Sequence, residues 1–210
     1  MSDRLLLIDT DMLVLLGGSG TLADVLSSFD FEPEQCRRLA AATEQLRRGR
    51  VFKDTYPATV LRAVLRAADG IVSLTEPPAN PTALDALASI SGIDLGEAQL
   101  FAMLAEHDGY YLTTGDKRAL VTLATSTKVA EIRGRVAGRV ICLESILKLL
   151  VRRNGANATA QAFRDLRTHR TVGVLLSDTQ ARSDQVCLHG IDSYLNDLIQ
   201  RTGEDFLYQP

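Results

Sequence analysis

Short apolar runs alternate with longer amphipathic segments along most of the chain. The apolar runs lack a helical period and predict strands at residues 4–8, 71–74, 110–113 and 139–143. Helical spacing of apolar residues predicts helices at residues 33–48, 54–68, 82–90, 95–107, 117–124 and 144–152, and a further helix opens at Thr21 or Asp24 after a glycine-rich loop at residues 17–20. This alternation predicts an α/β fold with a parallel sheet covered by helices on both faces.

The pattern changes after residue 152. Residues 157–168 and 180–201 have helical periodicity and flank a short apolar stretch at residues 172–176. In the last helix Ile191, Leu195 and Leu198 form one stripe, which either packs on the rest of the chain or joins two copies in a homodimer, with packing the favoured alternative. We therefore predict a domain at residues 1–152 and a helical C-terminal extension at residues 153–210.

Composition excludes several classes of protein. The 210 residues are 46% hydrophobic, which is enough for a buried core, and no apolar run approaches the length of a membrane span. A net charge of −3 excludes a polycation that coats nucleic acid, and 5% aromatic residues without tryptophan argue against a base-stacking platform. Cys36, Cys142 and Cys187 are few and far apart, so we expect no disulfide framework or zinc site and a cytoplasmic protein without a membrane partner.

Two aspartates follow predicted strands. Asp9 ends the first strand and Asp116 comes just after the third. The carboxyl ends of parallel strands meet at the edge of the sheet where such folds bind ligands, so the two side chains converge if their strands are neighbours. Each residue also has a purely structural interpretation, because Asp116 can cap the helix that follows it and Asp9 can simply end a strand.

Glu97 adds a third carboxylate in an unusual position. On a helix that Asp94 caps, Glu97 falls within a broad apolar arc that consists of Leu95, Ala98, Phe101, Ala102, Leu104 and Ala105. A carboxylate on a buried face costs several kcal/mol unless a cation or hydrogen-bond donors neutralise it. The alternative is a first-turn glutamate whose head reaches water near the positive end of the helix.

Carboxylates from three distant segments form a hard oxygen site of the kind that suits Mg²⁺ or Mn²⁺. Such an ion activates a bound water and neutralises charge on a scissile phosphodiester. On this hypothesis Asp9, Glu97 and Asp116 are both the metal ligands and the catalytic residues.

Three segments together resemble the signatures of PIN-domain ribonucleases, in the same order and at similar spacing. They are residues 5–13 (LLLIDTDML), 94–100 (DLGEAQL) and 112–120 (LTTGDKRAL), and the likeness covers about residues 4–150. The resemblance implies a three-layer α/β/α sandwich and metal-dependent endonucleolytic cleavage of RNA, with Asp9, Glu97 and Asp116 as metal-binding acids. Because many members of the family are toxins, it also admits an antitoxin or another protein partner.

The chain departs from the family pattern after Asp116. The family usually has a fourth acidic or polar residue shortly after that aspartate, and this chain has Lys117 and Arg118 there. The candidates for additional site residues are Asp11, Thr10 and Asp94, and Glu144 is a further substitute for the fourth acid.

Two other functions stay open. One is a catalytically silent PIN-like module that binds RNA or protein, suggested by Lys117, Arg118 and the long extension. The other is a phosphatase similar to the haloacid dehalogenases, with Asp9 as nucleophile and Asp11 as general acid. It is less favoured, because the second acid of that family's late motif is missing and Glu97 would have no role.

Arginines gather at two places, which are residues 37, 38, 47, 48 and 50, and residues 133, 135 and 139. Either group could contact RNA phosphates, but such runs are more often solvated faces.

Overall fold

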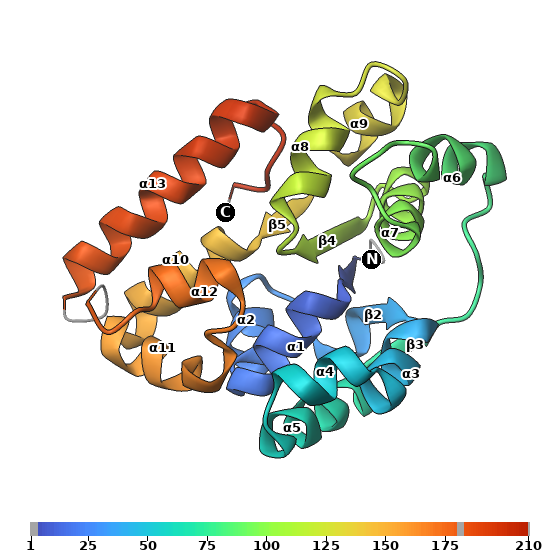
Figure 1. Ribbon diagram of the computed structural model, residues 1–210. Coiled ribbons are helices and arrows are strands. Elements are labelled where there is room, and N and C mark those ends of the chain that lie inside the picture. The colour runs from blue at the N-terminus through green and yellow to red at the C-terminus, as the bar shows by residue number, and fades with distance from the viewer. Residues whose placement is uncertain (1–3, 180–182, 210) are drawn as a thin grey trace.

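A central parallel sheet organises the chain in the computed structural model, which describes residues 4–179 and 183–209 (Figure 1). Its five strands are β1 (Leu5–Ile8), β2 (Cys36–Leu39), β3 (Val72–Leu74), β4 (Tyr110–Thr114) and β5 (Val140–Cys142), in the order β3-β2-β1-β4-β5. Helices cover both faces, so the predicted α/β class and three-layer α/β/α sandwich are confirmed.

The helices fall into groups that follow the chain. Between β1 and β3 lie α1 (Thr10–Ser19), α2 (Leu22–Ser28), α3 (Ala40–Arg48), α4 (Arg50–Thr55) and α5 (Ala58–Asp69). Between β3 and β5 lie α6 (Pro81–Ala88), α7 (Leu95–Glu106), α8 (Lys117–Thr125) and α9 (Ala130–Val136). After β5 come α10 (Leu143–Asn154), α11 (Ala156–Ala162), α12 (Arg170–Leu175) and α13 (Asp184–Thr202), and short 3₁₀ turns occur at Pro33–Gln35 and Arg164–Leu166.

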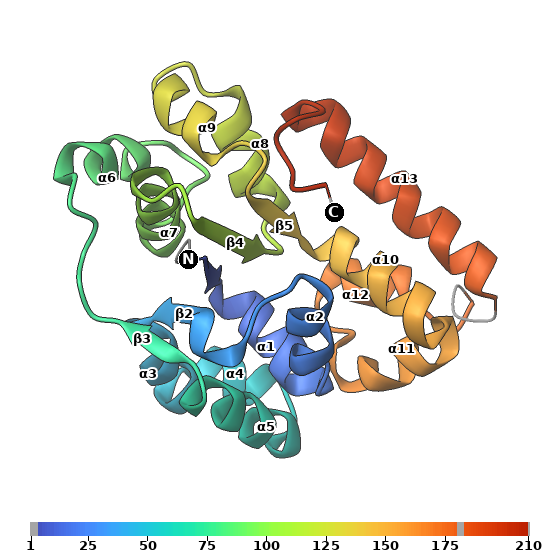
Figure 2. The same cartoon turned by 180° about the vertical axis from the view of Figure 1, so that it is seen from behind.

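The sheet separates two hydrophobic cores because side chains alternate between its faces. Leu6 and Ile8 of β1 join a core with α1, α2, α5 and α10 to α12, whereas Leu7 joins a core with α6 to α9. Figures 1 and 2 show these two sets of helices on opposite sides of the strands.

The helix predicted at residues 33–48 was wrong in its first half. The segment forms a 3₁₀ turn at Pro33–Gln35 and then strand β2, and only α3 is helical. Arg38 of β2 is 9% exposed, and its Nε donates to the carbonyl of Ala68 at 2.8 Å. Arg38 can be buried in a strand because this carbonyl from a distant segment accepts its hydrogen bond. Local periodicity does not reveal such a contact.

The glycine-rich loop predicted at residues 17–20 was also wrong, because α1 continues to Ser19. Gly17 lies where α1 crosses α5, and a Cβ atom there would be 2.9 Å from Cβ of Ala67. Glycine therefore permits a close approach of two helices here, in spite of its low helix propensity. Gly20, with φ of 74°, ends the helix in the left-handed conformation.

Other boundaries differ in smaller ways. The helix predicted at residues 54–68 is two helices, because Pro57 separates α4 from α5. The apolar stretch at residues 172–176 lies mainly in helix α12, and α9 was not predicted. The predicted helix at residues 180–201 corresponds to α13, although residues 180–182 lie outside the described part.

The stripe on the last helix packs on the rest of the chain. Ile191 and Leu198 are fully buried, the first in the core of α1 and α10 and the second in the core of α7 and α8. Lys148 of α10 pairs with Asp192 of α13 at 2.6 Å. Helices after residue 153 thus share the cores of the sheet, and the division at residue 152 stays a prediction.

Candidate functional site

The strands that carry Asp9 and Asp116 are neighbours, as convergence required. β1 pairs with β4 in parallel, and the amide of Asp9 donates to the carbonyl of Thr113 at 3.1 Å. Thr114, the last residue of β4, donates its hydroxyl to Oδ2 of Asp9 at 2.9 Å and accepts the amide of Asp116 at 3.2 Å. The hydroxyl of Thr114 therefore contacts both aspartates at the end of the sheet.

This end of the sheet is also a topological switch point. The chain passes from β1 to β2 and β3 on one side and then returns to β4 on the other side of β1. Loops leave the sheet in opposite directions at such a point and open a crevice at the carboxyl ends of the strands. Asp9 and Asp116 flank that crevice.

Glu97 reaches the site from the first turn of α7. Asp94 and Glu97 form a capping box, in which the amide of Asp94 donates to Oε2 of Glu97 at 2.7 Å and the amide of Glu97 donates to Oδ1 of Asp94 at 2.8 Å. Glu97 is 7% exposed. The third carboxylate is thus both a helix cap and a buried acid.

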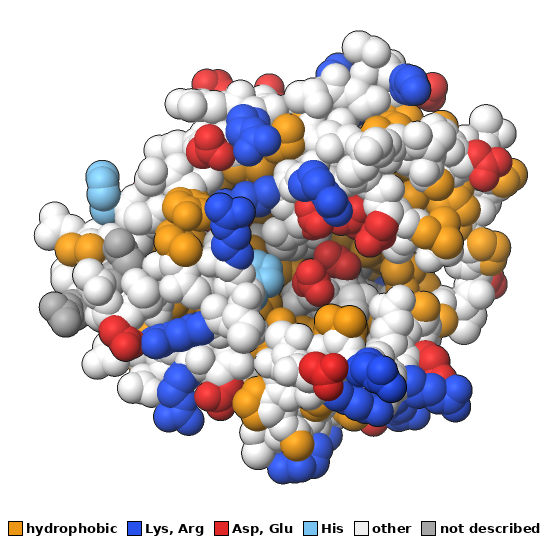
Figure 3. All heavy atoms as spheres, viewed as in Figure 1, with side chains coloured by type: hydrophobic (Ala, Val, Ile, Leu, Met, Phe, Trp, Pro, Cys, Tyr) orange, Lys and Arg blue, Asp and Glu red, His pale blue; other side chains and the backbone are white. Residues whose placement is uncertain are grey.

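One cavity of about 530 Å³ is lined by all the candidate site residues except Glu144. The residues that line it are Asp9, Thr10, Asp11, Asp94, Glu97 and Asp116. Acidic side chains gather near the middle of the face drawn in Figure 3. The rest of the lining is an uncharged wall that consists of Leu39, Ala41, Ala42, Gln45, Phe52, Leu95, Gly96 and Gln99.

Burial and mutual repulsion raise the pKa values of Asp9, Asp11 and Glu97. Burial first, and then the charges of Asp11 and Asp94, raise the pKa of Asp9 from 3.8 to about 6. The hydrogen bonds from Thr114 and Thr10 oppose this rise. Burial also raises the pKa of Asp11, and the charge of Asp116 adds to that rise.

The largest rise belongs to Glu97. Burial first, and then the neighbouring charges of Asp116 and Asp94, raise the pKa of Glu97 to about 8, against the hydrogen bond from the Asp94 amide. The site thus concentrates negative charge that a proton or another cation must neutralise.

The donor chemistry fits a hard divalent cation, but the ligands are not gathered around one point. Among residues 4–179 and 183–209, no group of three or more His, Cys, Asp or Glu side chains is placed to hold a metal ion. Oxygens of all three predicted ligands serve as helix caps, with Asp9 accepting the amide of Thr10 at 2.6 Å and Asp116 the amide of Ala119 at 2.9 Å. A carboxylate oxygen that accepts one such bond keeps a second lone pair for a cation.

Glu144, a candidate for the fourth acid, forms an ion pair with Lys117 beside the site. Nζ of Lys117 lies 2.7 Å from Oε1 of the buried Glu144 and 4.2 Å from the ring centre of Tyr194. Glu144 is therefore neutralised within the fold and does not line the cavity. Asp11, which does line it, is the better candidate for the fourth acid.

His169 was missed by sequence reasoning. It precedes α12, and its interactions with Asp11, Asp116 and Glu144 oppose the burial that lowers its pKa. Its Nδ1 is buried without a hydrogen-bond partner in the described part of the chain. No spacing in the sequence could have linked it to the carboxylates, because the extension brings it there.

The arginine clusters mainly serve the fold. Arg38 is buried in β2, Arg47 pairs with Asp69 at 3.2 Å, and Arg133 donates to the carbonyl of Ala124 at 3.1 Å. Arg139 donates to backbone carbonyls, among them that of Tyr110 at 3.3 Å. These contacts agree with the structural interpretation of both groups.

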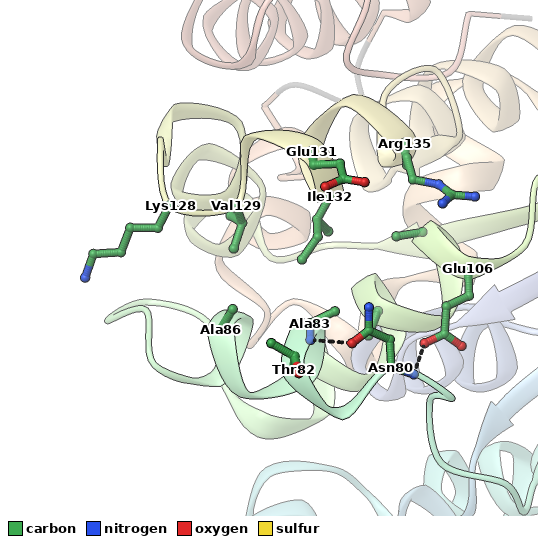
Figure 4. A pocket seen from close by; sticks show the side chains of 12 residues that line it. Asn80, Thr82, Ala83, Ala86, Glu106, Lys128, Val129, Glu131, Ile132 and Arg135 are labelled. Carbon is green, nitrogen blue, oxygen red and sulfur yellow. Dashed lines mark hydrogen bonds between the residues drawn. The ribbon is translucent and has the colours of Figure 1, made fainter.

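Another cavity, of about 260 Å³, lies between α6, α7 and α9 (Figure 4). Glu106 on its wall accepts the amides of Ala79 and Asn80 at 2.9 and 2.8 Å, and Asn80 in turn caps α6 through the amide of Ala83. Its best-placed polar groups therefore hold the loop before α6.

Comparison of the chain with models of known protein families, with curated proteins and with solved structures found no match. No helix in the described ranges is long and apolar enough to cross a membrane. All three cysteines are buried and free.

Proposed function

We propose that the protein is a divalent-metal-dependent endoribonuclease. The observation that carries the proposal is the meeting of five carboxylates from three distant segments in one cavity at the switch point of the sheet. Burial and repulsion raise the pKa values of three of these carboxylates, so their ionised forms destabilise the fold. Structural needs alone therefore do not account for such a concentration of acids.

Asp9, Glu97 and Asp116 would hold Mg²⁺ or Mn²⁺, with Asp11 as an additional oxygen donor. The ion would supply an activated water and neutralise charge on the scissile phosphate. Thr114 orients Asp9 through its hydroxyl, and the capping box with Asp94 orients Glu97. The pKa of Glu97 is raised to about 8, so this acid holds a proton at neutral pH that leaves when the cation binds, and metal affinity rises with pH.

The resemblance to PIN-domain ribonucleases implies that the substrate is RNA. A cytoplasmic location, and an antitoxin or another protein as partner, belong to the same proposal. A homodimer is not favoured by the stripe of Ile191 and Leu198, since both side chains are buried within one chain.

An RNA cleavage assay tests the proposal. Single-stranded and structured RNAs are incubated with Mn²⁺, Mg²⁺ or EDTA, and the parent is compared with Asp116→Asn, which keeps an acceptor for the helix cap. Cleavage should require metal and fall at least 100-fold in the variant, whereas Asp54→Asn on the exposed side of α4 should cleave like the parent. Equal cleavage by parent and Asp116→Asn contradicts the proposal.

A silent binding module is the second candidate. It is favoured by the commitment of the carboxylates to helix caps and by the absence, within the described residues, of three ligands placed around one point. RNA or protein binding that persists in EDTA, without cleavage in any metal, would support it. Turnover of p-nitrophenyl phosphate with a phosphoaspartate on Asp9 would instead support the phosphatase.

A further inference from the structure

The lining of the cavity has two chemically unlike parts. One part is the carboxylates, and the other includes Gln45 of α3, Phe52 of α4 and Gln99 of α7. Neither glutamine side chain has a hydrogen-bond partner in the described part of the chain. Leu95, 62% exposed, adds apolar surface to the wall. The uncharged part of the lining thus offers unused amides and apolar surface.

An adjoining cavity extends this wall. It has a volume of about 270 Å³, shares Leu39, Ala41 and Gln99 with the first cavity, and continues to the loop at residues 75–78. No lysine or arginine is among the described residues that line either cavity. The lining of the adjoining cavity includes one acid, Glu76. A phosphate would find no cation along this wall and would be repelled by Glu76, so the part of a ligand that lies here is expected to be uncharged.

An unpaired nucleobase has the matching chemistry. Its faces are apolar and its edge carries hydrogen-bond donors and acceptors, which is how single-stranded RNA is read. A glutamine amide both donates and accepts, so it can pair with such an edge. Phe52 is held by Tyr56, with ring centroids 6.5 Å apart and an angle of 21° between the planes. A base in a duplex has its edge paired and could not use these groups.

We propose that the uncharged part of the cavity lining binds one unpaired nucleobase of single-stranded RNA, next to the phosphate that faces the carboxylates. The proposal rests on the proposed ribonuclease function and specifies its substrate. The low aromatic content excludes a platform for several bases, and the site instead uses one ring and two amides. Recognition is therefore expected at one nucleotide rather than along a run.

Photocrosslinking tests base binding without cleavage. A single-stranded RNA with 4-thiouridine at one position is irradiated with the parent in Ca²⁺ and in EDTA, and the crosslinked peptides are mapped. Crosslinks should fall within residues 39–56 and 95–103 and should drop at least fivefold in the double variant Gln45→Ala, Gln99→Ala. The matched control is Gln161→Ala on the exposed side of α11, which should crosslink like the parent.

The outcomes separate the two proposals. Crosslinks that map only elsewhere, that persist in the double variant, or that do not form at all would overturn the nucleobase site, whatever the cleavage assay gives. Crosslinks at the predicted residues with no cleavage in any metal would support the nucleobase site and contradict the ribonuclease. Where cleavage occurs, the double variant should mainly raise KM, and an abasic nucleotide beside the cleaved bond should abolish the difference between it and the parent.

Discussion

Asp9→Asn should make the metal-free protein more stable at pH 8. The carboxylate of Asp9 lies among other acids, and its pKa rises from 3.8 to about 6 in the fold. Asparagine can still accept the amide of Thr10 and can donate to the hydroxyl of Thr114, so the substitution removes charge and keeps the hydrogen bonds. The variant thus isolates the cost of the buried charge.

The magnitude follows from the shift in pKa. A rise of about two units, at about 1.36 kcal/mol per unit, corresponds to about 3 kcal/mol of destabilisation when Asp9 is ionised. Because the pKa is raised in the folded state, the unfolded chain releases this proton first as the pH increases. Stability is therefore lost between pH 3.8 and about 6, and the full cost applies above that range.

Urea unfolding in EDTA measures the effect. At pH 8 Asp9→Asn should exceed the parent by up to about 3 kcal/mol, and at pH 4.5 the gain should shrink to about 1 kcal/mol. Asp54→Asn serves as the matched control, and its free energy of unfolding should equal that of the parent at both pH values. A variant that is less stable than the parent at pH 8, or a gain that does not change with pH, would refute the reasoning.

Three further predictions concern the same surroundings. Lys117→Met should cost about 3 kcal/mol in urea unfolding, because it leaves the buried Glu144 without its cation, and a smaller loss than 1 kcal/mol would argue against the ion pair. Gly17→Ala should cost about 1–3 kcal/mol in the same experiment, since its Cβ would crowd Ala67, and an unchanged midpoint would contradict the close approach of α1 and α5. Mn²⁺ should raise the melting temperature of the parent in a thermal scan and not that of Glu97→Gln, whereas equal shifts would place the metal elsewhere.

The sequence predicted the parts of the site that depend on local chain geometry. Asp9 and Asp116 follow apolar strands, and Glu97 stands out as a charge on an apolar helical face. The direction of each of these side chains depends on a few neighbouring residues of its own strand or helix. The convergence of Asp9 and Asp116 on one cavity then required only that β1 and β4 be neighbours.

The missed features depend on packing between distant segments. β2 contains Arg37 and Arg38, and it becomes a strand because it lies between β1 and β3. His169 approaches the carboxylates because α12 packs into the core of α1, and no local pattern carries that information. The pairing of Lys117 with Glu144 likewise needs β5 beside β4.

Binding of Mn²⁺, measured by isothermal titration calorimetry, tests the central claim most directly. The parent should bind Mn²⁺ with release of protons, more tightly at pH 8 than at pH 6, because Asp9 and Glu97 hold protons with raised pKa values. Asp9→Asn and Glu97→Gln should each lose this binding while remaining folded. Absence of Mn²⁺ binding to the folded parent, or equal binding by parent and both variants, would contradict a metal site at these carboxylates.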